Sequence, residues 1–182
     1  MIAKGSSTRL ANKNTLDFCG KPLYQWNLQK LLNIFSKVVF DSDNIEMLDH
    51  AKKVGAIPHK REEKLLGDEV PSVPIFQSII KKFPEYSFMI NVQANSPTIS
   101  NSTIKKIKNI STFNNVNEIL TMFSDFSING AVWGISRYRL DNYGCYYTKK
   151  PDALILDTSQ DIHTQEEFDS AQEFHFKNNK DN

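Results

Sequence analysis

The sequence predicts an α/β fold in which a mainly parallel β-sheet is covered by helices on both faces. Short apolar runs of strand length alternate along the chain with longer stretches whose apolar residues recur every three or four positions. Strands and helices that alternate in this way favour right-handed crossovers and parallel pairing. The chain has 182 residues, which suits one domain. We expect that domain to cover residues 1–176, followed by a polar tail over 177–182.

Six apolar segments are the expected strands. The first is very short, and the segment at 115–122 carries the weakest pattern. Pro58 is expected near the end of its strand, because proline cannot donate to a ladder of hydrogen bonds. The expected strands cover residues 1–3, 37–41, 55–58, 86–92, 115–122 and 153–156.

Five segments with helical periodicity lie between and after these strands. Gly55 stands where a helix C-cap is expected, and Ser100 or Asn101 is a suitable N-cap. Thr164 and Glu167 have the spacing of a capping box. The expected helices cover residues 23–35, 45–54, 73–83, 104–110 and 164–176.

Composition limits the kind of protein. The 22 Lys and Arg residues nearly balance the 21 Asp and Glu residues, which argues against a general nucleic-acid binder. No apolar run approaches the roughly 18 residues of a membrane span, and the first residues lack the apolar core of a secretory signal. Cys19 and Cys145 are far apart in sequence, so we expect two reduced thiols and a cytoplasmic protein.

Three polar segments follow apolar runs and are candidates for the functional site. They are Lys4–Asn14, Asp41–Asn44 and Gln93–Pro97. Ligands of open α/β sheets bind beyond the carboxyl ends of the strands. One sheet could therefore bring the three segments together.

The first of these segments has the composition of a phosphate-binding loop. Lys4–Asn14 contains one glycine, three hydroxyl residues and three cations. Small residues let successive backbone N–H groups face an anion, and cationic side chains neutralise phosphate oxygens. The loop is neither a Walker A motif nor G-x-G-x-x-G. An exposed, solvated loop is the alternative interpretation.

Several motifs, in order along the chain, resemble those of the acylneuraminate (CMP-sialic acid) cytidylyltransferase family, which includes CMP-nonulosonate and CMP-Kdo synthetases. Ala3–Asn14 resembles A-R-G-G-S-K-R-L-x-x-K-N, Cys19–Leu23 resembles C-G-K-P-L, and Val92–Pro97 resembles L-Q-P-T-S-P. Further similarities are Val38–Asp43 to V-V-V-S-T-D, His59–Asp68 to L-R-P-x-x-L-A-x-D, Asn129–Ala131 to N-G-A-I-Y, and Asp161–Phe168 to D-I-D-T-x-x-D-F.

The resemblance implies a three-layer α/β/α Rossmann-like nucleotidyltransferase fold of the GT-A-like kind. It also implies a nucleotidyltransferase that transfers CMP from CTP to a sialic-acid-like or other 3-deoxy-2-keto sugar acid. In that reaction the anomeric hydroxyl of the sugar attacks the α-phosphate, and pyrophosphate is released. CTP and the sugar acid are the implied partners; we expect no nucleic acid and no membrane.

The resemblance also implies roles for individual residues. The catalytic residues would be Lys4, Lys13 and Asp161. The nucleotide-binding residues would be Ala3, Lys4, Gly5, Ser6, Ser7, Lys13, Arg61 and Gln93. The acceptor-binding residues would be Asn129, Asn95 and Ser96.

The implied cofactor is Mg²⁺, with Mn²⁺ as the alternative. The metal-binding D-x-D of the family corresponds here to Asp161-Ile-His163, and imidazole is a better ligand for Mn²⁺ than for Mg²⁺. Asp161 is therefore the expected ligand, and Asp157 is a candidate assistant. His163 is either close to the metal or a helix N-terminal residue without a ligand role.

The chain is shorter than the family pattern between about residues 98 and 128. The resemblance therefore implies a more open sugar pocket and a homodimer whose arm is reduced or absent. Two alternatives stay open: a nucleotidyltransferase with another acceptor or base, and a non-catalytic nucleotide-binding homologue.

Overall fold

The computed structural model describes residues 1–67, 69–113, 115–144 and 150–178, and within them the main sheet has four strands. In spatial order they are β5 (Phe88–Val92), β7 (Ile128–Ser136), β6 (Glu118–Met122) and β8 (Ala153–Leu156). β7 pairs antiparallel with both β5 and β6, whereas β6 and β8 pair in parallel. Three of the four strands thus run in one direction, and β7 runs against them.

A second, parallel pair of strands extends this arrangement. β3 (Val39–Ser42) pairs with β4 (Ile57–Lys60). The first residues of the chain connect the pair to the main sheet. Ile2 forms a parallel bridge with Asp41, and its backbone N–H donates to the Asn91 side chain of β5 over 3.1 Å. The strand predicted at residues 1–3 is thus a single bridge.

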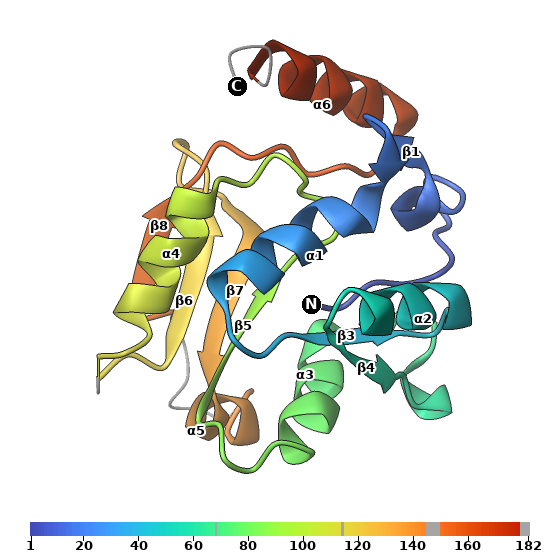
Figure 1. The fold of residues 1–182 in the computed structure, drawn as a ribbon. Coiled ribbons are helices and arrows are strands. Elements are labelled where there is room, and N and C mark those ends of the chain that lie inside the picture. The colour runs from blue at the N-terminus through green and yellow to red at the C-terminus, as the bar shows by residue number, and fades with distance from the viewer. Residues whose placement is uncertain (68, 114, 145–149, 179–182) are drawn as a thin grey trace.

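Helices cover both faces, which confirms the predicted three layers (Figure 1). α1 (Leu23–Ile34), α2 (Ile45–Lys53) and α4 (Asn101–Ile110) bury apolar side chains with those of β3, β5 and β6 in the largest core cluster. α3 (Ser72–Lys81) and α5 (Arg137–Asp141) pack on the opposite face, where Phe76 and Leu140 meet Ile135.

The C-terminal helix lies beyond the end of the sheet (Figure 1). α6 (Gln165–Asn178) packs against a small antiparallel hairpin, β1 (Asp17–Phe18) and β2 (Lys21–Pro22). Phe168 contacts Phe18 edge to face, with ring centroids 5.5 Å apart. The predicted capping box is confirmed, since Thr164 Oγ1 accepts from the N–H of Glu167 and the Glu167 carboxylate accepts from that of Thr164. α6 extends two residues past its predicted end, and 179–182 lie outside the described residues.

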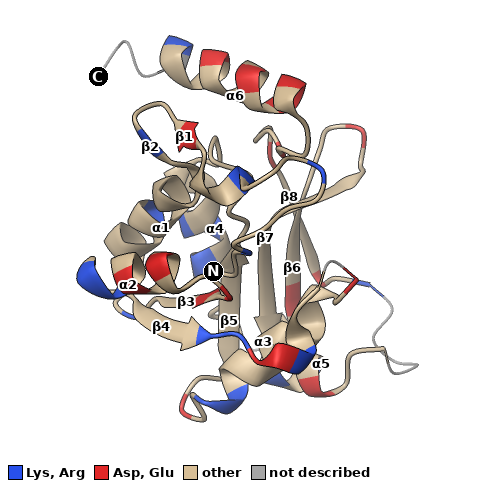
Figure 2. Ribbon diagram, turned by 90° about the vertical axis from the view of Figure 1, so that its right-hand side faces the viewer, with Lys and Arg blue, Asp and Glu red and all other residues tan. Residues whose placement is uncertain are grey.

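Charged residues of both signs are interspersed over the elements, and acidic residues recur along α6 (Figure 2). This distribution agrees with the net charge of +1. In the described residues, no helix combines the length and the apolar character that a bilayer crossing needs. Cys19 is a half-buried free thiol, and Cys145 lies outside the described residues.

The sequence did not predict β7 or α5, and glycine explains the missed strand. Two glycines interrupt the apolar pattern of β7, which suggests a turn rather than a strand. At Gly134 the strand passes so close to its neighbours that a Cβ would lie 3.1 Å from Phe88 and 3.3 Å from Ile107 of α4. The glycine that weakens the strand signal is thus what lets α4 pack onto the sheet.

Proline explains a smaller error. β4 begins two residues later than predicted, so Pro58 stands at its second position rather than near its end. β4 pairs only with β3 in the described part of the chain, and such an edge strand tolerates the missing N–H.

The close packing at Gly134 gives a stability prediction. Gly134→Val should lower the free energy of unfolding by about 1–3 kcal/mol, because the added atoms overpack the contact with Phe88 and α4. Urea denaturation measures the change. Leu154→Val is the matched control: Leu154 is 46% exposed on β8, so its change should stay within about 0.5 kcal/mol. Equal stability of the two variants would contradict the prediction.

Candidate active site

A cavity of about 520 Å³ opens where β4 and β5 end. Most of the residues predicted for the site line it, although they come from five separate parts of the sequence. They are Ala3, Lys4, Ser6, Ser7, Lys13, Arg61, Gln93, Asn95, Asn129, Asp161 and His163. This position agrees with the expectation that the ligand binds beyond the carboxyl ends of the strands.

The first loop is anchored at both of its ends. Lys4 Nζ donates to the carbonyl of Gly67 over 2.7 Å, and Asn14 Nδ2 donates to the carbonyl of Lys4 over 2.8 Å. Thr8 and Arg9 also line the cavity. The sequence offered a signal for these two, because they belong to the same cationic loop as Ser7.

Gly5 supports the loop from behind rather than lining the cavity. Its N–H donates to Asp43 over 2.6 Å. A Cβ at this position would lie 2.7 Å from the Cβ of Asn44, which caps α2. Any larger residue would therefore push the loop away from α2.

Lys13 is a buried cation at the cavity wall. It lies in a short 3₁₀ helix (Lys13–Thr15), and only 8% of its surface is exposed. Its ammonium donates to the carbonyl of Ile162. Burial lowers the pKa of Lys13, and the charge of Asp161 partly opposes this shift. The loop and the segment at 161–163 thus meet through this lysine.

Asp161 and His163 form a pair at the same end of the cavity. His163 Nε2 lies 2.7 Å from one carboxylate oxygen of Asp161, and Asn95 Nδ2 donates to the other. The backbone N–H of His163 donates to Glu167 over 2.7 Å, so the start of α6 holds the histidine.

The pair offers a limited donor set for a metal ion. Among the residues described, no three His, Cys, Asp or Glu side chains converge on one point. Mg²⁺ is commonly held by one or two carboxylates together with substrate phosphates. Asp161 fits that arrangement, and the imidazole of His163 adds a donor that Mn²⁺ accepts more readily.

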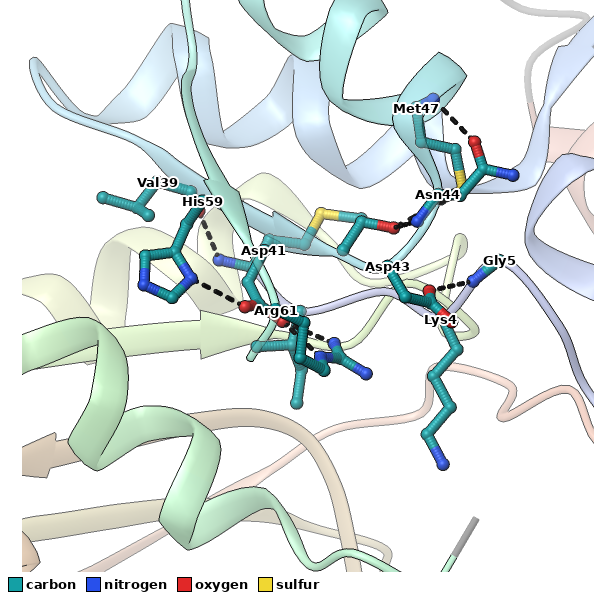
Figure 3. Close-up of polar contacts among 12 residues, drawn as sticks. Lys4, Gly5, Val39, Asp41, Asp43, Asn44, Met47, His59 and Arg61 are labelled. Carbon is teal, nitrogen blue, oxygen red and sulfur yellow. Dashed lines mark hydrogen bonds and ion pairs between the residues drawn. The ribbon is translucent and has the colours of Figure 1, made fainter. Parts of the chain in front are cut away.

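Arg61 is held by a buried acidic residue (Figure 3). Its Nε donates to Asp41 Oδ1 over 2.7 Å, and its Nη2 lies 2.5 Å from the same oxygen. His59 Nδ1 lies 2.8 Å from Asp41 Oδ2. All three residues are at most 5% exposed. Of the three, only Arg61 lines the cavity.

The segment at 41–44 therefore supports the site without lining it. Asp41 holds Arg61, Asp43 holds the backbone of Gly5, and the Asn44 side chain accepts from the N–H of Met47 (Figure 3). The sequence placed this segment at the correct edge of the sheet, but its side chains act from behind the cavity wall.

Two further candidates lie away from the cavity. Ser96 is fully buried, and its carbonyl accepts from Asn27 Nδ2 over 2.8 Å, so it cannot contact a bound acceptor from this position. Asp157 is buried and accepts from the hydroxyl of Thr103 over 3.0 Å and from the N–H of Ser159. Neither residue lines the cavity in this structure, so the two predictions gain no support from it.

α1 supplies two positioning residues that the sequence did not indicate. Asn27 donates to the carbonyl of Gln93 over 2.7 Å as well as to that of Ser96, and Lys30 donates to the carbonyls of Pro97 and Ile99. Burial lowers the pKa of Lys30 to about 8. α3 adds part of an apolar wall that the sequence also missed, consisting of Ile2, Val70 and Ile75.

Comparison with known proteins identifies the family. Residues 2–176 match the family model described as "Cytidylyltransferase". The pseudaminic acid cytidylyltransferase of Campylobacter jejuni subsp. jejuni serotype O:2 is 32% identical over 111 residues, which cover 57% of this chain and 48% of that protein. N-acylneuraminate cytidylyltransferase B of Danio rerio is 31% identical over 114 residues, covering 59% of this chain and 26% of that protein.

Solved structures support the same fold. A CMP:2-keto-3-deoxy-manno-octonic acid synthetase complexed with CTP superposes with a TM-score of 0.78 over 97% of both chains, at 13% identity. A Mycobacterium tuberculosis protein complexed with manganese superposes with a TM-score of 0.69 over 94% of this chain and 95% of that one, at 12% identity. The sequence alignments span half or less of the curated relatives described above. With the family match over nearly its whole length, the chain belongs to the cytidylyltransferase family.

Proposed function

We propose that this protein transfers CMP from CTP to a nonulosonate or related 3-deoxy-2-keto sugar acid and releases pyrophosphate. The observation that carries the proposal is the shared cavity: the cationic first loop and the Asp161–His163 pair line it together. Nucleotidyl transfer needs cations near the phosphates and a fixed alignment of the attacking and leaving oxygens. The family match adds the preference for cytidine.

The first loop is suited to the triphosphate. Lys4 and Lys13 would offset the charge of the phosphate oxygens, and Ser6 and Ser7 would donate hydroxyl hydrogen bonds to them. Lys13 is held by the protein itself, because its ammonium donates to the carbonyl of Ile162. Such a preorganised cation needs little rearrangement as negative charge develops.

Other residues of the cavity lining are suited to the nucleoside. Arg61 and Gln93 supply polar groups to the cavity, which is also lined by the apolar side chains of Ile2, Val70 and Ile75. A flat base packs well against apolar residues while a few fixed polar groups select its edge. These features support the cytidine assignment of Arg61 and Gln93.

The sugar acid would bind next to Asn95 and Asn129. Asn129 Oδ1 accepts from the N–H of Ala131, while its Nδ2 has no protein partner among the residues described. An amide donor of this kind suits a sugar hydroxyl or carboxylate. Residues 98–128 are largely taken up by α4, β6 and their connections, which supports a reduced dimer arm.

Asp161 and His163 would hold a divalent ion together with the phosphates. When bound, such an ion supplies positive charge against the developing charge of the reacting phosphate. We propose Mg²⁺ or Mn²⁺, and the imidazole favours Mn²⁺.

The first prediction concerns turnover. With CTP and a divalent ion, the protein should release pyrophosphate when pseudaminic acid, N-acetylneuraminate or 3-deoxy-manno-octulosonate is added. CTP should also raise the melting temperature more than the other nucleoside triphosphates, because only a ligand that binds the native state stabilises it. A larger shift with a purine nucleotide would favour another base. CTP binding without turnover on any acceptor would favour a non-catalytic homologue.

Lys13→Met tests the phosphate side. The variant should bind CTP about 10- to 100-fold more weakly, which is the usual loss for a charged hydrogen bond. The pKa of Lys13 is lowered in the folded chain, so its charge costs stability at neutral pH, and this cost is relieved as the pH rises through the lowered pKa. The melting temperature at pH 7 should therefore not fall greatly.

Calorimetry and thermal melting measure these two quantities. Lys52→Met, which removes an exposed lysine of α2, should leave CTP affinity unchanged. Wild-type affinity in Lys13→Met would remove this residue from the site.

His163→Asp tests the metal preference. Replacing imidazole with a carboxylate should strengthen Mg²⁺ binding relative to Mn²⁺ in the CTP complex, because Mg²⁺ prefers oxygen ligands. Electron paramagnetic resonance of Mn²⁺, with Mg²⁺ as competitor, reports the ratio without turnover. His50→Asn, on α2 and away from the cavity, is the control. An unchanged ratio would leave His163 without a ligand role.

A further inference from the structure

Asp41 is a fully buried carboxylate that does not line the cavity and yet directly contacts a residue that does. It is 0% exposed, and both of its oxygens are occupied by side chains of the strand β4 and its continuation. The family motif that Val38–Asp43 resembles has serine at the position of Asp41. The aspartate at position 41 is therefore a feature of this chain that its similarity to the family motif does not explain.

The contact fixes the direction of Arg61. Arg61 stands one residue beyond β4, and its backbone N–H donates to the carbonyl of Ser42 over 3.0 Å. A long arginine side chain at a strand end has many rotamers to lose. Arg61 Nε and Nη2 lie 2.7 and 2.5 Å from Asp41 Oδ1 (Figure 3). These contacts select one rotamer of Arg61, which lines the cavity.

His59 completes the support from the side away from the cavity. Its Nδ1 lies 2.8 Å from Asp41 Oδ2. The carboxylate is therefore held between His59 of β4 and Arg61, which follows β4. A buried carboxylate that kept only one partner could turn about its own side-chain bonds. With both oxygens occupied, Asp41 offers Arg61 a fixed acceptor.

The backbone of Asp41 aligns a second part of the same wall. Its N–H donates to the carbonyl of Met1 over 3.0 Å, and its carbonyl accepts from Ala3 over 2.9 Å. Ala3 and Arg61 both line the cavity. One residue thus determines where the first loop begins and where the guanidinium lies.

We propose that Asp41, supported by His59, is a positioning residue that holds Arg61 in the orientation needed to bind the nucleotide. The inference rests on the proposed function, in which Arg61 contacts the nucleoside of CTP. Asp41 itself touches no substrate. The effect of its carboxylate on binding therefore passes through Arg61, whereas its backbone bonds to residues 1–3 are kept in a side-chain variant.

A double-mutant cycle tests this dependence. Asp41→Asn keeps the shape of the side chain but loses its charge, and Arg61→Met keeps the bulk of the arginine stem. Calorimetry with CTP is carried out on the wild type, each single variant and the double variant, and thermal melting is recorded for each. The control is Glu118→Gln, which neutralises a matched buried carboxylate whose ion pair with Arg139 lies outside the cavity.

The proposal expects Asp41→Asn to weaken CTP binding about 10- to 100-fold, as misplacement of a binding group does. In the Arg61→Met background the same substitution should have no further effect. Glu118→Gln should lower the melting temperature but leave CTP affinity unchanged. Where Asp41→Asn yields no folded protein, His59→Asn replaces it in the cycle, with an expected loss of about 3- to 10-fold.

Two results would overturn the inference while leaving the proposed function intact. One is wild-type CTP affinity in the folded Asp41 or His59 variant. The other is an equal loss with and without Arg61, which would mean that the substitution acts through general destabilisation. A wild-type protein that binds no CTP would instead overturn the proposed function, and the role of Arg61 with it.

Discussion

The carboxylate of Asp41 is the constraint on which the arrangement of the molecule depends. A buried charge without partners is very costly, so the fold must supply hydrogen-bonding partners to the Asp41 carboxylate on β3. Its partners come from β4 and the residue after it, and its backbone pairs with residues 1–3. β3, β4 and the start of the first loop are thereby held in one register. The cavity wall follows from this register, because Arg61 and Ala3 lie on either side of the same residue.

The site also contains buried cations that the fold alone has no need for. Lys13 is 8% exposed and Arg61 is 4% exposed, and hydrophobic residues of similar size would cost less to bury. The charges of Asp161 and Glu167 act on Lys13, and the buried Asp41 pairs with Arg61. A cavity that keeps such cations at its wall is suited to an anionic ligand. The proposed phosphate site would thus be held at some cost in stability.

Periodicity and motif order in the sequence predicted most of this architecture. The helices from α1 to α4 and the strands β3, β5, β6 and β8 all stand close to their expected places, since all but β6 have a clear apolar face or run. β7 was hidden by Gly130, which takes a positive φ where the β6–β7 pairing is irregular, and by Gly134, which allows close packing. Only the folded chain reveals these contacts.

The sequence likewise predicted some of the site residues and missed others. Motif order selected most of the polar residues that line the cavity, because strand ends converge at one edge of a sheet. It could not distinguish Gln93 and Asn95, which line the cavity, from Ser96, which faces the interior. Nor could it indicate Asn27, because a polar residue on a helix is usually a solvated one. Asn27 is instead fully buried and holds the carbonyls of Gln93 and Ser96.

The position of the Asp161–His163 pair depends on a part of the molecule outside the main core. Ile162, between the two, is fully buried among Phe18, Leu23 and Phe168 of the hairpin, α1 and α6. Its N–H donates to Asn95 over 2.9 Å, and its carbonyl accepts from Lys13. The small core beneath α6 therefore fixes the backbone from which both side chains extend. The first loop, the segment after β5 and the C-terminal helix meet at this one residue, so the docking of α6 sets how closely Asp161 approaches Lys13.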